Sequence, residues 1–196
     1  QTDTIYAPRT GLTDNILIGD LRLYANYSQT SLGGQDEYSD YSTLYQTISK
    51  VSRTKVNTYR RTMVYLRYAE AMNRAGLPQS AFAVLKYGLC QENNNEYIDS
   101  LERAAAADLI SFDENVFTRE KVIGIHSFGS GDTECNAFYT MPQPDHRLAT
   151  RQDTINWQIP EVEDLIIDEM ALEGAFEGYR YYDLMRVALR RADTAY

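Results

Sequence analysis

Two helix-forming segments joined by a glycine and a proline constrain the fold of this chain more than any other feature. Apolar residues recur at helical spacing over residues 59–75, which predicts an amphipathic helix. Gly76 suits the left-handed residue that follows a helix, and Pro78 suits the first turn of the next helix, which extends to about Leu89. The pattern therefore predicts a helical hairpin over residues 59–90. The residues on the shared face of its first helix are Tyr65, Tyr68, Ala69 and Met72.

Small residues in both segments favour a close approach of the two helices. They are Ala69, Ala81 and Gly88. This alternation of large and small residues resembles one tetratricopeptide unit. Such units bury a core only when about three of them stack, and no second convincing copy is present. We therefore expect the hairpin to pack against the rest of the chain or against a preceding part.

A second helical unit is predicted over residues 160–192. Pro160 marks its start, and acidic residues crowd its first turns, which suits the positive end of the helix dipole. Glu169 falls within an apolar stripe, so we expect an arginine to neutralise it. The stripe consists of Val162, Leu165, Ile166, Leu172, Phe176 and Tyr179, and the apolar face continues after Gly178 with Tyr182, Met185 and Leu189.

Outside these two units, only residues 96–109 show helical character. We expect a loop from Ser28 to Ser42 with a hinge at Gly33-Gly34, a short alanine-rich helix within residues 96–109, a strand at 122–125 and a loop over 129–151. The predicted fold is mainly α, a single domain over residues 1–196 with long loops.

Composition excludes several classes of function. A net charge of −9 argues against a nucleic-acid surface, which needs clustered basic residues. The chain has no apolar run of about 20 residues, so no transmembrane helix is expected. Cys90 and Cys135 are compatible either with one disulfide or with two separate thiols. The 16 tyrosines favour a recognition surface, because tyrosine is rigid and amphipathic.

Three strings in the second half and middle of the chain resemble the SusD/RagB family, and they occur in the family's order. They are YLRYAEAMNRAGLP at residues 65–78, GIHSFGSGD at 124–132, and DEMALEGAFEGYRYYDLMR at 168–186. The last string is the most specific of the three. The resemblance implies a SusD-like helical fold that contains tetratricopeptide units.

The resemblance also implies a function. SusD/RagB proteins are lipid-anchored proteins of the outer membrane of Gram-negative bacteria, exposed at the cell surface. They bind glycans or oligosaccharides without catalysis and pass them to a SusC-like, TonB-dependent transporter. We expect no cofactor, no metal and no enzymatic activity. The family's members are longer and carry a signal peptide and a lipidated cysteine, so this chain, which begins with Gln1, is expected to be a processed or C-terminal portion.

Six residues of the closing string are expected to be structural. Their spacing allows salt bridges around a helix corner at a glycine. They are Glu173, Glu177, Gly178, Arg180, Asp183 and Arg186.

Ligand contacts are expected from loop aromatics with amides beside them, because sugars bind by stacking on rings and by hydrogen bonds. Trp157 is the first choice, as the only tryptophan. The full set is Asn156, Trp157, Gln158, Tyr38, Tyr41, Tyr45 and Tyr139.

Other functions remain open at this stage. A protein-interaction module would use the groove of the 59–90 hairpin. A hydrolase would use the carboxylate pair Glu173 and Glu177. A zinc site from His126, His146 and Cys135 lacks recognisable spacing, and a calcium site has no EF-hand pattern to support it.

Overall fold

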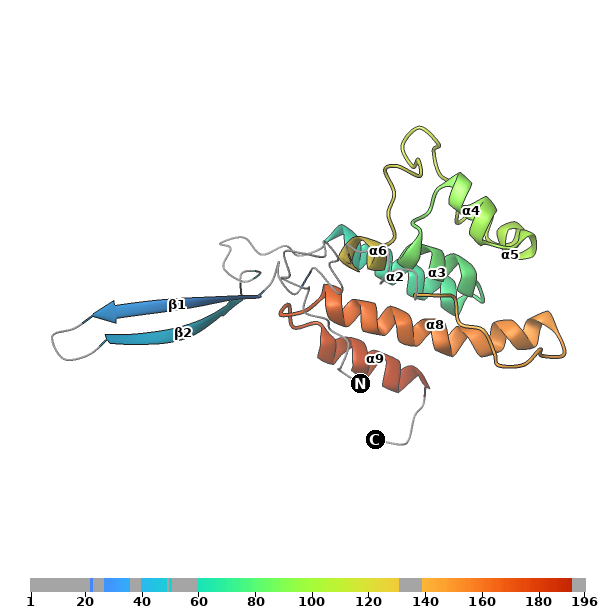
Figure 1. The fold of residues 1–196 in the computed structure, drawn as a ribbon. Coiled ribbons are helices and arrows are strands. Elements are labelled where there is room, and N and C mark those ends of the chain that lie inside the picture. The colour runs from blue at the N-terminus through green and yellow to red at the C-terminus, as the bar shows by residue number, and fades with distance from the viewer. Residues whose placement is uncertain are drawn as a thin grey trace.

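The computed structural model describes residues 60–130 and 139–191, together with residues 22, 27–35, 40–48 and 50. This part of the chain is mainly helical, with one two-stranded sheet (Figure 1). The elements are β1 (Tyr27–Gln35), β2 (Asp40–Ile48), α2 (Arg61–Arg74), α3 (Pro78–Lys86), α4 (Gln91–Tyr97), α5 (Ser100–Ala105), α6 (Ile125–Ser130), α8 (Arg151–Glu173) and α9 (Arg180–Arg191).

The predicted hairpin is confirmed as α2 and α3. Gly76 has φ +84°, as expected of a residue that ends a helix, and Pro78 is the first residue of α3. Helix α3 ends at Lys86, three residues earlier than predicted. The two helices pack through residues with no solvent exposure, which are Leu66, Ala69, Ala81 and Leu85.

Helix α8 begins nine residues earlier than predicted, so the assignment of Pro160 as the first residue of a helix was wrong. Thr150 accepts a hydrogen bond from the Asp153 backbone N–H at 3.1 Å, and Asp153 accepts one from the Thr150 N–H at 3.0 Å. This capping box starts the helix, and Pro160 lies inside it on the exposed side. Val162 and Ile166 are fully buried, as the predicted stripe requires.

Most of the segment from Ser28 to Ser42 belongs to two paired strands rather than to a loop, and residues 36–39 lie outside the described residues. Strands β1 and β2 pair antiparallel, from Tyr27 opposite Ile48 to Gln35 opposite Asp40. The two glycines predicted as a hinge lie within β1, where Gly33 pairs with Ser42 and Gly34 with Tyr41. Pairing with a partner strand, which is not a local property of the sequence, outweighs the low strand propensity of glycine. The hairpin projects away from the helices (Figure 1).

The prediction of a strand at residues 122–125 was wrong. Residues 122–124 are irregular, and α6 begins at Ile125. A Cβ at Gly124 would lie 2.2 Å from the carbonyl carbon of Lys86, so the segment lies directly against the end of α3. This close backbone approach explains the glycine without a sheet.

Two short helices, α4 and α5, follow the α2–α3 hairpin. Helix α5 lies within the predicted alanine-rich region, whereas α4 was not predicted because Asn93 and its two asparagine neighbours are weak helix formers. The free thiol of Cys90 caps α4 by accepting a hydrogen bond from the Asn93 N–H at 3.5 Å. Cys135 lies outside the described residues. Residues 139–150 have no helix or strand, as predicted.

The apolar face predicted after Gly178 exists on α9, but it faces solvent rather than the core. Tyr182, Met185 and Leu189 are exposed, as is Phe176 before the helix. The side of α9 that faces the protein is charged. Among the described residues, no helix is both long and apolar enough to cross a membrane.

Candidate functional site

Glu173 and Glu177, at the end of α8 and in the corner that follows, are bound by basic residues. Lys50 lies 2.7 Å from Glu177 and donates to the Glu173 carbonyl at 2.6 Å. Arg60 contacts both carboxylates, and Thr62 donates to Glu173 at 2.9 Å. Burial alone would raise the pKa of Glu173, but hydrogen bonds from Arg60 and Thr62 outweigh it and lower the pKa.

This geometry does not suit the hydrolase alternative. A glycosidase needs one carboxylic acid with a raised pKa to protonate the leaving group. The pKa of Glu173 is lowered instead, and both carboxylates are paired with Arg60. Both carboxylates are thus held in ion pairs with Lys50 or Arg60 at the end of α8 and in the corner that follows.

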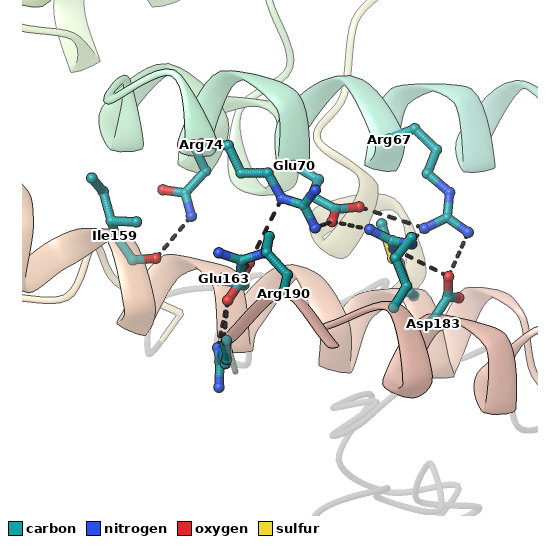
Figure 2. A network of polar contacts seen from close by, with 11 residues as sticks. Arg67, Glu70, Arg74, Ile159, Glu163, Asp183 and Arg190 are labelled. Atoms are coloured by element: carbon teal, nitrogen blue, oxygen red, sulfur yellow. Dashed lines mark hydrogen bonds and ion pairs between the residues drawn. The ribbon is translucent and has the colours of Figure 1, made fainter. Parts of the chain in front are cut away.

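A second group of ion pairs joins α9 to α2 (Figure 2). Asp183 is 1% exposed and lies 2.5 Å from Arg67, with Arg186 at 3.3 Å. Glu70, which is 5% exposed, is contacted by Arg186, Arg74 and Arg67. Of the salt bridges that the spacing of the motif residues allows, the described residues show one, between Asp183 and Arg186, and both of these lie within α9. The other ion pairs of the motif, such as Arg67–Asp183 and Arg186–Glu70, join it to residues outside the motif.

Helix α8 is tied into the same network. Buried Glu163 is paired with Arg190 and, at 2.7 Å, with Arg191 of α9. Asn73 of α2 donates to the Ile159 carbonyl at 2.8 Å (Figure 2).

The corner between α8 and α9 matches its sequence motif. Gly178 has φ +79°, a conformation that glycine adopts without strain, and Arg180 donates to the Ile167 carbonyl at 2.7 Å. These contacts fix how the chain turns from α8 into α9.

Glu169 has the arginine partner that the sequence predicts. The Arg22 guanidinium lies 2.5 Å from this buried carboxylate, and His126 Nδ1 lies 2.9 Å from its other oxygen. The His126 ring stacks on Tyr139 with 3.7 Å between ring centroids. Among the described residues no group of three potential metal ligands occurs, and Cys135 of the suggested zinc set lies outside them.

A pocket of about 580 Å³ lies between α3, α4, α5 and the irregular segment 139–150. This is within the usual size range of small-molecule sites, roughly 300–1,000 Å³. Its floor is apolar, with Phe82 and Ile98 buried. Its rim is polar and consists mainly of Gln79, Asn95, Glu96, Asp99, Ser100, Arg103 and Gln143.

Two stacked tyrosines form one wall of this pocket. The rings of Tyr87 and Tyr97 are parallel within 3°, with centroids 3.6 Å apart, and Tyr97 is 39% exposed. Tyr97 hydrogen-bonds Glu96, which raises the pKa of the Tyr97 hydroxyl, and Arg119 pairs with the same carboxylate. Tyr97 is therefore held in place while part of its surface remains open.

The opposite rim is fixed by Asp99. This carboxylate caps α5 by accepting from the Leu101 and Glu102 N–H groups at 3.0 and 2.8 Å. Gln79 donates to it at 2.8 Å, and Arg151 binds it at 3.0 Å. Burial would raise the pKa of Asp99, but these hydrogen bonds lower it, so the group is an anion at neutral pH.

Tyr139 supports the pocket from below rather than presenting an open ring. Its ring stacks on the His126 ring and also on the Phe82 ring. The centroids of the Tyr139 and Phe82 rings are 5.4 Å apart. Its hydroxyl is buried and has no hydrogen-bond partner among the described residues. Burial and the nearby Glu169 raise its pKa well above the usual value.

The other sequence-predicted ligand residues lie apart from one another. Asn156, Trp157 and Gln158 are in the middle of α8, so their assignment to a loop was wrong. Gln158 is buried and donates to the Pro142 carbonyl at 3.0 Å, which positions the segment that carries two pocket residues, Met141 and Gln143.

Two of the three remaining tyrosines belong to strand β2. Tyr41 and Tyr45 are in β2, opposite Gly34 and Thr30, and Tyr38 lies outside the described residues.

Sequence reasoning missed the pocket's own aromatic wall. Tyr97 follows Asn95 and Glu96 directly, so an aromatic ring with an amide close by, the combination that drew attention to Trp157, is present here as well. The signal was present, but the region was interpreted as part of an alanine-rich helix.

A second pocket, of about 470 Å³, lies between α2, α3 and residues 112–128. Its walls are mostly apolar and include Phe112, Phe117 and Phe128. Few hydrogen-bonding groups line it, so it suits a sugar less well than the pocket beside Tyr97.

Comparison with known proteins identifies the family. No curated protein and no solved structure matches this chain. The sequence model of the SusD family matches residues 24–195, which include α2 and its arginines, the buried carboxylates of α8 and the corner at Gly178. The match covers most of the chain, and we conclude that this protein belongs to the SusD/RagB family.

Proposed function

We propose that this protein binds a neutral glycan or oligosaccharide, without catalysis, in the pocket beside Tyr97. Membership of the SusD family supports glycan binding for nutrient uptake as the general role. The observation that carries the proposal is an open, firmly held tyrosine ring with amide and carboxylate groups around it.

The chemistry of the pocket matches that of a sugar. The C–H groups of a sugar ring pack on the face of an aromatic side chain, and its hydroxyls exchange hydrogen bonds with amides and carboxylates. Tyr97 offers the ring, while Asn95, Ser100 and Gln143 offer exposed polar groups on the rim. The contacts of Asp99 hold this rim rigid, so little conformational entropy is lost on binding.

The β-hairpin and α8 offer further ligand contacts. Tyr41 and Tyr45 lie four residues apart on a strand that projects from the helices, and Trp157 is half-buried on α8 beside exposed Asn156. A long glycan that reaches beyond one pocket would contact such residues as well. We include them, with Tyr38, as secondary positions in the proposal.

The proposal places the bound glycan at the surface of the bacterial outer membrane, for transfer to a SusC-like, TonB-dependent transporter. Family membership supports this location and partner.

Calorimetric titration against a panel of neutral oligosaccharides tests the proposal. We expect saturable binding that Tyr97→Ala weakens by about 5- to 30-fold, the usual effect of removing a central aromatic contact. The matched control is Tyr181→Ala, because Tyr181 is 69% exposed on α9 and outside the pocket. Trp157→Ala and Tyr45→Ala measure the secondary positions.

Two outcomes would contradict the proposed site. The first is binding that Tyr45→Ala or Trp157→Ala abolishes while Tyr97→Ala leaves it unchanged. The second is an absence of binding to every glycan together with binding to a protein partner that depends on the α2–α3 hairpin, which would favour the protein-interaction alternative.

A further inference from the structure

A third pocket, of about 300 Å³, lies between α4, α5 and residues 107–111. We call it the Ala104 pocket, after one of its lining residues. It adjoins the pocket beside Tyr97, because Asn95 of α4 and Arg103 of α5 line both of them. A ligand that is too long for the pocket beside Tyr97 would therefore reach the Ala104 pocket by passing over these two side chains.

The lining of the Ala104 pocket suits a sugar chain. Gln91 and Ser111 are exposed there and offer an amide and a hydroxyl, which exchange hydrogen bonds with sugar hydroxyls. Ala104 and Ala107 are exposed as well, and their small side chains leave room for a ligand. The described lining includes no carboxylate and no aromatic ring. Hydrogen bonds rather than stacking would therefore hold a sugar in this pocket.

Arg103 is held in place at the boundary between the two pockets. Its Nη1 donates to the Asn95 carbonyl at 2.5 Å and to the Asn94 carbonyl at 3.4 Å. Its Nε and Nη2 donate to no group in the described part of the chain, and no carboxylate pairs with Arg103 there. Since a guanidinium carries five N–H donors in a rigid fork, several of them are left for a ligand on either side of the boundary.

The carboxylates beside this boundary do not compete for those donors. Glu96 pairs with Arg119, and Asp99 pairs with Arg151 at 3.0 Å. Neither of these two arginines lines the pocket beside Tyr97 or the Ala104 pocket. The negative charges on the rim are thus compensated from outside, and the donors of Arg103 can bind the hydroxyls of an uncharged sugar.

We propose that the two pockets are adjacent subsites for one extended glycan, which passes from the Tyr97 ring over Asn95 and Arg103 to Ala104. This inference rests on the proposed function, because it needs a sugar beside Tyr97. It narrows the ligand class to oligosaccharides of several units. The contacts beyond Arg103 add affinity only for a chain long enough to reach them, so affinity rises with chain length.

Calorimetric titration with gluco-, manno- and xylo-oligosaccharides of two, four and six units tests the inference. In the series that binds best, we expect the hexasaccharide to bind at least about tenfold more tightly than the disaccharide, since a few added hydrogen bonds contribute on this scale. Ala104→Trp fills the Ala104 pocket and should remove most of this difference, while disaccharide binding stays within about twofold of the wild type. The matched control is Ala105→Trp, because Ala105 is exposed on the same helix and lines neither pocket.

The disaccharide separates a failure of this inference from a failure of the proposed function. If no series binds at any length, the proposed function fails and the inference fails with it. If the disaccharide binds in a manner that depends on Tyr97 but the hexasaccharide binds no more tightly, only the inference is overturned. The same holds if Ala104→Trp leaves the difference intact or weakens both lengths equally. Unchanged disaccharide binding also shows that the variant is folded.

Nuclear magnetic resonance of ¹³C-labelled alanine methyl groups tests the path of the glycan independently of affinity. The signals of Ala104 and Ala107 should shift with the hexasaccharide but not with the disaccharide of the same series. The signal of Ala105 should shift much less with either ligand. A bound hexasaccharide that leaves Ala104 and Ala107 unshifted, or a disaccharide that shifts them equally, would refute the two-subsite arrangement.

Discussion

Replacing Glu70 with glutamine should destabilise the protein more than any other single loss of charge in the α2–α9 network. Glu70 is 5% exposed and is contacted by Arg67, Arg74 and Arg186. Glutamine keeps the shape of the side chain but removes the negative charge. The three guanidinium groups then keep Asp183, which lies near Arg67 and Arg186, and Glu163, which is 3.9 Å from Arg74.

The structure limits the size of the effect. Breaking a fully buried ion pair costs about 3–5 kcal/mol, because the remaining charge is left without a partner. Here the three arginines are 33–42% exposed, so they regain hydration when the carboxylate is lost. We therefore expect a decrease of about 2–3 kcal/mol in the free energy of unfolding, or about 5–10 °C in Tm for a chain of this length.

Urea denaturation at pH 7, followed by far-ultraviolet circular dichroism, measures this change. The matched control is Glu92→Gln, since Glu92 is 69% exposed and lies 3.5 Å from Arg119. An exposed pair contributes little, so the control should remain within about 0.5 kcal/mol of the wild type. A loss below about 1 kcal/mol in Glu70→Gln would refute the idea that this carboxylate holds α9 on α2.

The remaining predictions concern the acid range, two glycines and a helix cap. The pKa of Glu173 in the folded protein lies below its ordinary value. The contribution of this carboxylate to stability is therefore fully present at pH values above the ordinary pKa and is lost as the pH falls through the folded pKa. Glu173→Gln should flatten the acid limb of a plot of stability against pH. Gly124→Ala should lower the free energy of unfolding by more than about 2 kcal/mol, because a Cβ would lie 2.2 Å from the backbone of Lys86. At Gly178 a Cβ would meet open space, so Gly178→Ala should lower it by only about 1 kcal/mol, the cost of a φ of +79°. Thermal unfolding compares the two variants. Thr150→Ala removes the cap of α8 and should lower the unfolding free energy by about 1 kcal/mol in a urea titration.

Local signals in the sequence were sufficient where the structure depends on neighbouring residues. Helical spacing, Gly76 and Pro78 predict α2 and α3, because the ends of a helix depend on a few adjacent side chains. The same kind of signal marks the start of α8, where Thr150 and Asp153 form a capping box. It was overlooked because Pro160 appeared to be a stronger boundary, although an exposed proline fits inside this long helix.

Features that depend on distant parts of the chain could not be predicted in this way. The strands β1 and β2 are stabilised by each other, and their polar sequences show little alternation. Helix α9 has two periodic stripes, one of Asp183, Arg186 and Arg190 and one of apolar residues. Periodicity in the sequence shows that both stripes exist but not which one faces inward. The charged stripe faces inward because it pairs with charged side chains of α2 and α8.

The pocket beside Tyr97 could not be predicted either, because it also depends on distant parts of the chain. Its walls come from α3, α4, α5 and the segment around Met141, which are brought together only by the fold. Tyr97 differs from other tyrosines because Tyr87 and Glu96 hold it in place, and neither contact is visible in a single sequence. Gln158 is buried and donates to the Pro142 carbonyl, a contact that its sequence neighbourhood does not indicate.

The residues that identify the family and those that line the pocket are physically separate. The closing motif is used inside the protein, where Glu173, Asp183 and Arg186 hold helices together through ion pairs. The pocket rim is on α4 and α5, where exposed Asn95 and Ser100 are not part of that network. Substitutions at the rim should therefore change ligand preference with little loss of stability, whereas substitutions in the motif should do the reverse. Membership of the family thus accounts for the scaffold, whereas our proposal assigns the choice of glycan to a few exposed side chains around Tyr97.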